Sequence, residues 1–256
     1  MDAEKLRSLF DLSGRVAVVT GGTRGIGRSL AEGFVAAGAA VVVASRKPDA
    51  CAETESHLRS LGGEALGVPT HVGDVAALPA LVERTVERYG RLDIVVNNAA
   101  TSLAQPLGGF TTEAWTKVFD VNLRGPVFLV QAALPHLTES PSASVINLIS
   151  VGAFTFSAGV SMYAAAKAGL LSFTRSMAAA YAKRGIRVSA LCPGSVDTEM
   201  TRNTGADGQA AMAAACLQKR IAEPDEMVGP ALFLASDAST YVTGQVLLAD
   251  GGLVPH

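Results

Sequence analysis

The sequence is poor in cysteine and carries little net charge. Its three cysteines, Cys51, Cys192 and Cys216, are too few and too scattered for a disulfide framework or a zinc site, and none has a histidine at ligand spacing. We therefore expect buried or idle thiols and no metal site. The formal net charge of −2 gives no basic field to attract nucleic acid and no polybasic patch for anionic lipid. Nucleic acid and membrane surfaces are therefore not expected partners.

Long apolar runs are also missing from the sequence. No run approaches the roughly 18 apolar residues that a membrane span requires. The first residues, Met1-Asp2-Ala3-Glu4-Lys5, mix charges and lack the apolar stretch of a secretory signal. We therefore expect a cytoplasmic protein.

Hydrophobic residues are abundant: they make up 49% of the 256 residues, against 17% for charged residues. This balance is typical of a compact enzyme with much buried or subunit-facing surface, and it favours a homo-oligomer. No repeat, low-complexity tract or Pro/Ser-rich linker divides the chain. We therefore expect residues 1–256 to form a single domain.

Short β-branched runs alternate with longer segments of helical periodicity. The predicted strands are residues 16–20, 40–44, 65–72, 92–97, 144–149, 186–191 and 245–249. The predicted helices are residues 26–37, 50–61, 78–89, 112–137 and 161–183. This alternation predicts an α/β Rossmann fold, a doubly wound seven-stranded parallel sheet with helices on both faces. The segment 198–219, rich in Ala, Gly and Thr, is predicted to be a flexible cover over a substrate site.

A glycine-rich turn follows the first predicted strand and opens a helix. Its sequence, from residue 21 to 27, is Gly-Gly-Thr-Arg-Gly-Ile-Gly. Glycines allow a tight turn and a close approach to a pyrophosphate, and a helix N-terminus offers unpaired N–H groups to the anion. The spacing departs from the commoner G-x-G-x-x-G pattern. Its place after the first strand of an alternating α/β chain nevertheless favours a dinucleotide site.

The end of the second predicted strand indicates which dinucleotide binds. NAD enzymes usually place an acidic residue there for the ribose 2′-hydroxyl, whereas this chain has Ser45-Arg46-Lys47. A guanidinium can hold a 2′-phosphate through charge-assisted hydrogen bonds, and Arg24 in the glycine turn can reach the same phosphate. Lys47 can equally be a solvated loop charge. We therefore predict NADP(H) as the preferred cofactor, with NAD(H) as the alternative.

Three residues form a candidate catalytic group. Tyr163 and Lys167 lie four apart in a predicted helix and share one face. An adjacent ammonium, helped by the positive charge of an oxidised nicotinamide, would lower the pKa of the phenol and make it a usable acid or base. Ser150 ends a predicted strand, at the edge of a parallel sheet where ligands bind, and its hydroxyl could steady a carbonyl oxygen.

These motifs together resemble those of the short-chain dehydrogenase/reductase superfamily, from about residue 14 to residue 253. Residues 20–27 match its T-G-x-x-x-G-x-G motif, Tyr163 and Lys167 match its Y-x-x-x-K motif, and Ser150 stands at the family's distance before the tyrosine. Segments 193–198, 242–245 and 250–252 match its later motifs. The likeness is to carbonyl reductases and to 3-oxoacyl-ACP reductases in particular.

The resemblance implies further site residues. Asn122 would interrupt a helix and hold a water that relays protons through Lys167 and a ribose hydroxyl to Tyr163. The backbone of Val196 and the hydroxyl of Thr198 would meet the nicotinamide carboxamide. The cofactor contacts expected in all are Gly21, Thr23, Arg24, Gly25, Ile26, Ser45, Arg46, Val72, Asn98, Ala99, Tyr163, Lys167, Pro193, Gly194, Val196 and Thr198.

The chain departs from the family pattern at two places. Ala100 replaces the last glycine of the family's N-N-A-G motif, which puts a methyl group where the backbone passes close to the ligand. His71 stands before Val72 where the family often has an acidic residue, and it can equally be a strand-end histidine that faces solvent. Ala100 is expected to narrow the pocket without preventing binding.

The expected activity is hydride transfer between a nicotinamide and a carbonyl or secondary alcohol, with Tyr163 as general acid/base. Phe154, Phe156, Met162 and Met200 near the site favour an apolar ketone or a 3-oxoacyl thioester, although they could equally be packing residues. An NAD(H)-linked polyol or sugar alcohol dehydrogenase is the first alternative. A non-catalytic NADP(H)-binding sensor or scaffold is the alternative of another class.

The resemblance also has an implication for assembly. It implies that the predicted helices 112–137 and 161–183 pair across a two-fold axis. We therefore expect a homotetramer or homodimer, in which Tyr163 stands on an interface helix.

Overall fold

Seven parallel strands form one sheet in the computed structural model, which describes residues 1–156 and 158–254. The strand order is β3-β2-β1-β4-β5-β6-β7, so the chain winds outward from β1 in one direction and then, beginning at β4, in the other. The strands are β1 (Val16–Thr20), β2 (Ala40–Ser45), β3 (Ala65–Pro69), β4 (Ile94–Asn97), β5 (Ser144–Leu148), β6 (Arg187–Pro193) and β7 (Val246–Ala249). The predicted doubly wound fold is confirmed.

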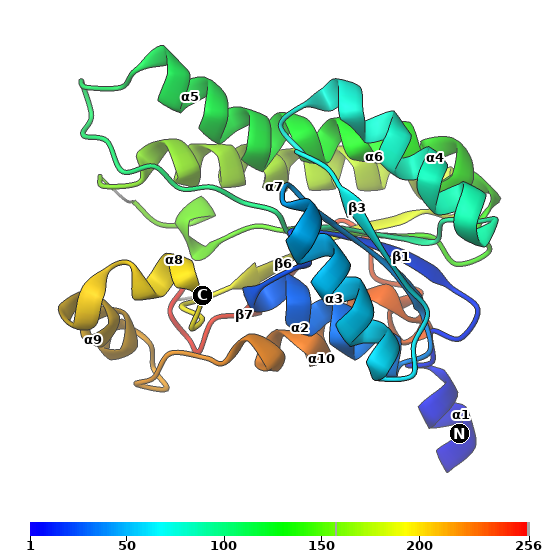
Figure 1. Ribbon diagram of the computed structural model, residues 1–256. Coiled ribbons are helices and arrows are strands. Elements are labelled where there is room, and N and C mark those ends of the chain that lie inside the picture. The colour runs from blue at the N-terminus through cyan, green and yellow to red at the C-terminus, as the bar shows by residue number, and fades with distance from the viewer. Residues whose placement is uncertain (157, 255–256) are drawn as a thin grey trace.

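Helices cover both faces of this sheet (Figure 1). One face carries α2 (Gly25–Ala36), α3 (Pro48–Ser60) and α10 (Val228–Ala235). The other carries α4 (Leu78–Tyr89), α6 (Gly125–Glu139) and α7 (Ser161–Tyr181), with α5 (Thr112–Phe119) packed against α7. No helix within the described residues is both long and apolar enough to span a membrane.

The alternation of side chains along the strands builds hydrophobic core on both faces of the sheet. Val41 and Val43 of β2 face the core shared with α2, where Phe34 is fully buried. Val42, between them, faces the core on the side of α4 and α6. Because successive strand residues point to opposite faces, a strand that is buried on both sides is expected to be mainly apolar. This explains the continuous apolar runs in the sequence.

Several element boundaries differ from the prediction. β3 ends at Pro69 rather than at residue 72, and β6 continues to Pro193. The predicted helix 112–137 is broken by a π-helical turn, Asp120–Arg124, which separates α5 from α6. The structure adds α10 and the short N-terminal helix α1 (Ala3–Ser8), which the sequence pattern missed. A glycine and a proline in α10 obscure its periodicity.

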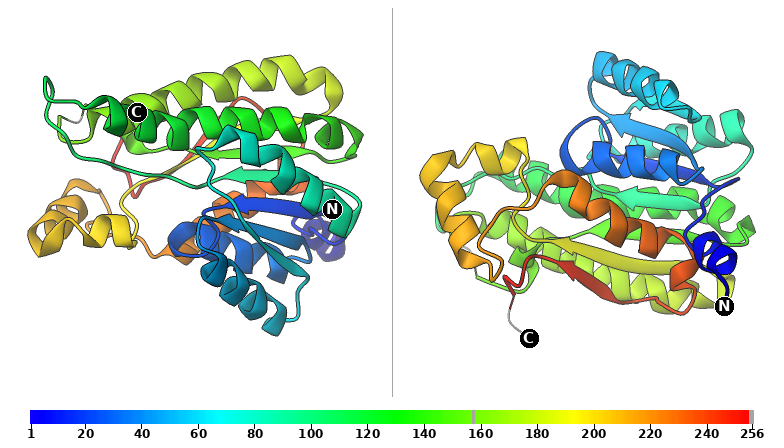
Figure 2. Two further views of the ribbon diagram at one scale, coloured as in Figure 1. Left: turned by 45° about the horizontal axis from the view of Figure 1, so that its top comes forward. Right: turned by 90° about the horizontal axis from the view of Figure 1, so that it is seen from below.

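The segment 198–219, which we call the cover segment, is not a loop throughout. It contains α8 (Glu199–Arg202) and α9 (Gly205–Ala215), and neither helix has a buried residue. Figure 2 shows this segment, in yellow and orange, at the end of the molecule away from α1. Its predicted flexibility stays a prediction.

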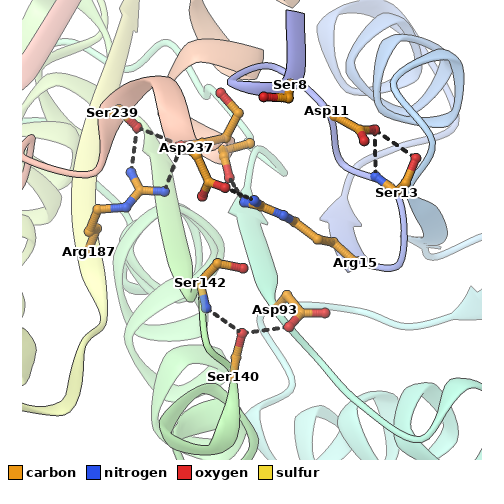
Figure 3. A network of polar contacts seen from close by, with 12 residues as sticks. Ser8, Asp11, Ser13, Arg15, Asp93, Ser140, Ser142, Arg187, Asp237 and Ser239 are labelled. Carbon is orange, nitrogen blue, oxygen red and sulfur yellow. Dashed lines mark hydrogen bonds and ion pairs between the residues drawn. The ribbon is translucent and has the colours of Figure 1, made fainter. Parts of the chain in front are cut away.

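The N-terminal ends of the strands form the amino edge of the sheet, which is stabilised by a polar network (Figure 3). Arg15 and Arg187 approach the C-terminal end of α10 from two sides and donate to the carbonyl oxygens of Ala235 and Leu234, at 3.2 and 2.8 Å. Arg15 also pairs with Asp237 at 2.8 Å. Cations at a helix C-terminus satisfy carbonyl groups that lack a partner within the helix. The polar residues at this edge stabilise the fold. The candidate site residues lie at the opposite edge of the sheet.

Candidate active site

The C-terminal ends of the strands form the carboxyl edge, and the predicted site residues lie along it. Ser150 follows β5, and its hydroxyl accepts a 3.2 Å hydrogen bond from the backbone N–H of Gly152. Tyr163 lies in the first turn of α7, one turn before Lys167. The Lys167 amino nitrogen is 5.7 Å from the centroid of the Tyr163 ring. The structure therefore brings together the three residues that the sequence grouped.

Lys167 is buried, with 1% of its surface exposed. Its amino group donates a 2.7 Å hydrogen bond to the carbonyl oxygen of Leu148, at the end of β5. Burial disfavours the charged form and lowers the pKa of Lys167 from 10.5 to about 8. The side chain is therefore an ammonium at neutral pH, but it is more easily deprotonated than an exposed lysine.

The pKa of Tyr163 is raised in the protein alone, contrary to the predicted lowering. Burial is the main cause, and hydrogen bonding with Ser150 opposes it. Cys192 in β6 adds a small upward contribution. Burial raises the pKa of the Cys192 thiol itself to about 12, so this cysteine is protonated at neutral pH. Because its pKa is raised, Tyr163 holds its proton firmly before any ligand binds.

All three cysteines are free and buried, as expected.

Asn122 lies in the π-helical turn between α5 and α6, so the predicted helix interruption is present. Its side chain is fully buried and satisfied: Nδ2 donates to the carbonyl oxygens of Thr101 and Val118, at 2.7 and 2.8 Å, and Oδ1 accepts from the Thr101 N–H at 3.2 Å. These bonds fasten the turn to the segment after β4. The proton-relay role of Asn122 stays a prediction.

The glycine turn, residues 21–27, connects β1 to α2. Gly21 adopts a positive φ of 65°, which favours glycine, and a Cβ on Gly27 would lie 2.3 Å from both the Asn98 side chain and the Gly21 carbonyl oxygen. Arg24, at the N-cap of α2, makes no side-chain cap. The first N–H groups of α2 therefore have no capping side chain, as a pyrophosphate site requires. The turn fits a dinucleotide.

Asn98 is a support of the glycine turn. Its side-chain amide donates to the carbonyl oxygens of Thr20 and Gly21, at 2.8 and 3.2 Å. The Thr20 hydroxyl accepts from the backbone N–H groups of Asn98 and Ala99, at 3.0 and 3.1 Å. Thr20 was not among the predicted site residues. A polar residue at the end of an apolar strand, directly before the turn, was the available signal.

The residues predicted to bind the 2′-phosphate are only partly brought together. Ser45 ends β2 and accepts a 3.1 Å hydrogen bond from Thr23, while Arg46 beside it is exposed. Arg24 does not join them: its guanidinium forms an ion pair with Glu199, the first residue of α8. The expectation that Arg24 and Arg46 converge therefore differs from the structure, because the cover segment offers Arg24 a carboxylate.

The segment after β6 leads into the cover segment. A Cβ on Gly194, which follows Pro193, would lie 2.7 Å from the Cα of Asp250. The Val196 side chain is buried and its carbonyl oxygen accepts a 2.6 Å hydrogen bond from the Thr201 hydroxyl. Thr198 caps α8 together with Thr201. The backbone path is thus fixed, whereas the nicotinamide contacts of Val196 and Thr198 stay predictions.

The two departures from the family pattern have clear positions. His71 is exposed, and its Nδ1 accepts a 3.0 Å hydrogen bond from the Gly73 N–H, which fits a solvent-facing histidine. Val72 beside it is buried. Ala99 is half-buried and Ala100 is exposed. The methyl group of Ala100 therefore lies at the surface of the site.

The apolar residues that were predicted to lie near the site differ in exposure. Phe154 follows Ser150 by four residues and is 42% exposed, and Phe156 is fully exposed. Met200, in α8, is 42% exposed, whereas Met162 beside Tyr163 is buried. Phe154, Phe156 and Met200 are therefore accessible to a substrate, and Met162 is a packing residue.

Comparisons with known proteins extend over nearly the whole chain. Residues 21–254 match the family model described as enoyl-(acyl carrier protein) reductase. The chain is 38% identical to cis-4-hydroxycyclohexanecarboxylate dehydrogenase of Sinomonas cyclohexanicum, over 93% of this chain and 96% of that protein. It is 34% identical to a 3-oxoacyl-[acyl-carrier-protein] reductase of Synechocystis, over 95% and 98% of the two chains.

A comparison with solved structures also shows similarity over nearly the whole chain. A gluconate 5-dehydrogenase of Burkholderia cenocepacia, in complex with NADP and tartrate, superposes with a TM-score of 0.93 at 34% identity. The match covers 97% of this chain and 98% of that one.

Proposed function

The chain belongs to the short-chain dehydrogenase/reductase superfamily, and from this premise we propose that it is an NADP(H)-dependent carbonyl reductase with Tyr163 as its general acid/base. It is an oxidoreductase of alcohols and ketones with a nicotinamide cofactor. The observation that carries the proposal is the grouping of Ser150, Tyr163 and Lys167 beside an uncapped helix N-terminus at one edge of the sheet.

Proton transfer is the part of the reaction that these side chains perform. Bound reduced nicotinamide would supply the hydride for the carbonyl carbon. As negative charge develops on the carbonyl oxygen, the Ser150 hydroxyl donates a hydrogen bond to it and the Tyr163 hydroxyl donates its proton. The Lys167 ammonium, 5.7 Å from the ring centroid, stabilises the phenolate that remains. In oxidation the phenolate takes the proton back.

The cofactor would be held along the carboxyl edge. The glycine turn and the first turn of α2 would receive the pyrophosphate, and Ala99 and Val72 would border the adenosine. Arg46 would bind the 2′-phosphate. It is exposed directly after Ser45, the residue that stands where NAD enzymes usually have a carboxylate. The proposed preference for NADP(H) rests on two features: the neutral Ser45 stands where NAD enzymes usually have an acidic residue, and the exposed Arg46 follows it.

The substrate is proposed to be an apolar ketone or a 3-oxoacyl thioester. Phe154, Phe156 and Met200 are exposed and offer apolar surface. The basic residues of the cover segment are engaged: Arg202 pairs with Asp197, and Lys219 donates to the Ala214 carbonyl oxygen. Arg220, directly after the segment, pairs with Glu226. A polyhydroxy acid is the competing class, because the similar Burkholderia enzyme is named a gluconate 5-dehydrogenase.

Assembly into a homodimer or homotetramer is proposed as well. Trp115 of α5, Phe128 of α6 and Phe173 of α7 are each at least 40% exposed. The three helices lie on the same side of the sheet (Figure 1). Exposed aromatic residues on adjacent helices are typical of a subunit interface. Light scattering coupled to size exclusion would give the oligomeric state directly.

The substitution Tyr163→Phe tests the proposed chemistry. Turnover of ketones, 3-oxoacyl thioesters and polyols would be followed by nicotinamide absorbance with NADPH and with NADH. Loss of the phenol should reduce kcat about a hundredfold or more, since a positioned acid contributes about that much, while NADPH still binds. Tyr181→Phe, on the same helix, is the matched control. Full turnover by Tyr163→Phe would reject the assignment.

A further inference from the structure

The ion pair between Arg24 and Glu199 links two parts of the site that are 175 residues apart in the sequence. Arg24 belongs to the glycine turn and Glu199 to the first turn of α8. Both side chains are more than 60% exposed. Neither side chain therefore contributes to a hydrophobic core. Their ion pair connects the proposed cofactor site to the cover segment.

Glu199 is held in place by its neighbours. The Thr198 N–H donates to the Thr201 hydroxyl at 2.9 Å, and that hydroxyl donates to the Val196 carbonyl oxygen at 2.6 Å. Arg202 makes two hydrogen bonds to the Asp197 carboxylate, at 2.7 and 2.8 Å. The first turn of α8 is therefore well fixed, and with it the backbone that carries the Glu199 carboxylate.

The glycine turn also lies close to Thr198, the residue that precedes α8. A Cβ on Gly25 would lie 3.2 Å from the methyl group of Thr198. The ion pair therefore joins two backbone segments that lie close together. The carboxylate of Glu199 is a resident anion beside the turn that is proposed to receive an anionic cofactor.

When NADP(H) binds, the Arg24 guanidinium would have two possible anionic partners: the Glu199 carboxylate and the 2′-phosphate. We propose that Glu199 is a cofactor-specificity residue: it competes with the 2′-phosphate of NADP(H) for the Arg24 guanidinium and so narrows the preference over NAD(H). This inference rests on the proposed use of NADP(H). If Arg24 leaves Glu199, the carboxylate loses its partner. If the guanidinium contacts both groups, the carboxylate and the phosphate repel each other. In either case Glu199 weakens 2′-phosphate binding.

Adenosine 2′,5′-bisphosphate and adenosine 5′-monophosphate are suitable probes, because they differ only in the 2′-phosphate and lack the nicotinamide half. Calorimetric titration of each gives the contribution of that phosphate to affinity. Glu199→Gln should bind the bisphosphate about two- to fivefold more tightly, the range expected for one exposed ion pair. The affinity for the monophosphate should stay unchanged.

Three further variants complete the test. Glu64→Gln is the matched control: Glu64 is 65% exposed and pairs with Arg88 at 3.0 Å, away from the glycine turn. It should leave both affinities unchanged. Arg24→Ala should weaken bisphosphate binding, and the gain from Glu199→Gln should disappear in the Arg24→Ala background. Thermal unfolding of each variant without ligand verifies that it is folded.

The outcomes separate this inference from the proposed cofactor preference. An unchanged bisphosphate affinity in Glu199→Gln, or a gain that persists without Arg24, would overturn the role of Glu199. Equal affinities of the wild-type protein for the two probes would instead reject the NADP(H) preference itself. A gain in Glu199→Gln that depends on Arg24 establishes the competition.

Discussion

The amino group of Lys167 donates a 2.7 Å hydrogen bond to the carbonyl oxygen of Leu148, two residues before Ser150. This bond connects α7, which carries Tyr163, to the end of the strand that carries Ser150. It also holds a charge inside the protein, since Lys167 is 1% exposed. The catalytic arrangement therefore includes a group that the folded state stabilises poorly.

Replacing this lysine should stabilise the protein without cofactor. The lowering of the Lys167 pKa from 10.5 to about 8 corresponds to a cost of about 3 kcal/mol for the buried charge at neutral pH. Lys167→Met removes that cost but leaves the Leu148 carbonyl without its donor, so a net gain of about 1–2 kcal/mol is expected. Urea denaturation measures it, with the exposed Lys183→Met as control. A less stable Lys167→Met would contradict the argument.

The same group should make stability depend on pH. Between pH 8 and 10.5 the unfolded chain holds a proton on Lys167 that the folded protein has released. The free energy of unfolding should therefore rise with pH in this window, relative to Lys167→Met. The advantage of the variant is largest below about pH 8, disappears within the window, and is reversed by pH 10.5, where only the loss of the hydrogen bond to Leu148 remains. Parallel denaturation curves across this window test it, and a constant difference would disagree.

Arg46 should govern cofactor choice. Arg46→Ala is expected to raise the KM for NADPH about tenfold, because one charge-assisted contact to the 2′-phosphate is lost. The KM for NADH should change much less. Lys47→Ala, one residue along the exposed segment after β2, is the control and should have a small effect. Equal effects of Arg46→Ala on both cofactors would reject the 2′-phosphate role.

Thr20 should act on both cofactors alike. Thr20→Val keeps the shape of the side chain but leaves the N–H groups of Asn98 and Ala99 without their acceptor. A loss of about 1–3 kcal/mol in the free energy of unfolding is expected, together with weaker binding of NADPH and NADH by the same factor. Thr20→Ser, which retains the hydroxyl, should restore binding. Weaker binding of NADPH alone would contradict the proposed role of the Thr20 hydroxyl in supporting the glycine turn.

The fold and the grouping of the three proposed catalytic residues were predictable because local pattern and tertiary structure agree there. Strands buried on both faces are expected to be mainly apolar, and residues four apart on a helix must share a face, so Tyr163 and Lys167 could be paired before their surroundings were known. Ser150 follows from the rule that parallel strands present their carboxyl ends to ligands. Each of these inferences needs only the spacing of residues.

Other features depend on packing between distant segments. The direction of the Tyr163 pKa follows from burial, which spacing does not reveal. The pairing of Arg24 with Glu199 requires the path of the chain after β6, and the role of Thr20 requires the neighbouring end of β4. The helix α10 was missed because Gly229 and Pro230 weaken its local signal, whereas contacts with α2 and β5 stabilise it.

The helices α8 and α9 contain no buried residue, although they lie next to the proposed substrate site. Substitutions there remove little from either hydrophobic core and so cost little stability. Selection for a new substrate can therefore act on these helices almost free of the constraint that folding places on the strands. The part of the enzyme that is proposed to cover the substrate is therefore open to evolutionary and laboratory change.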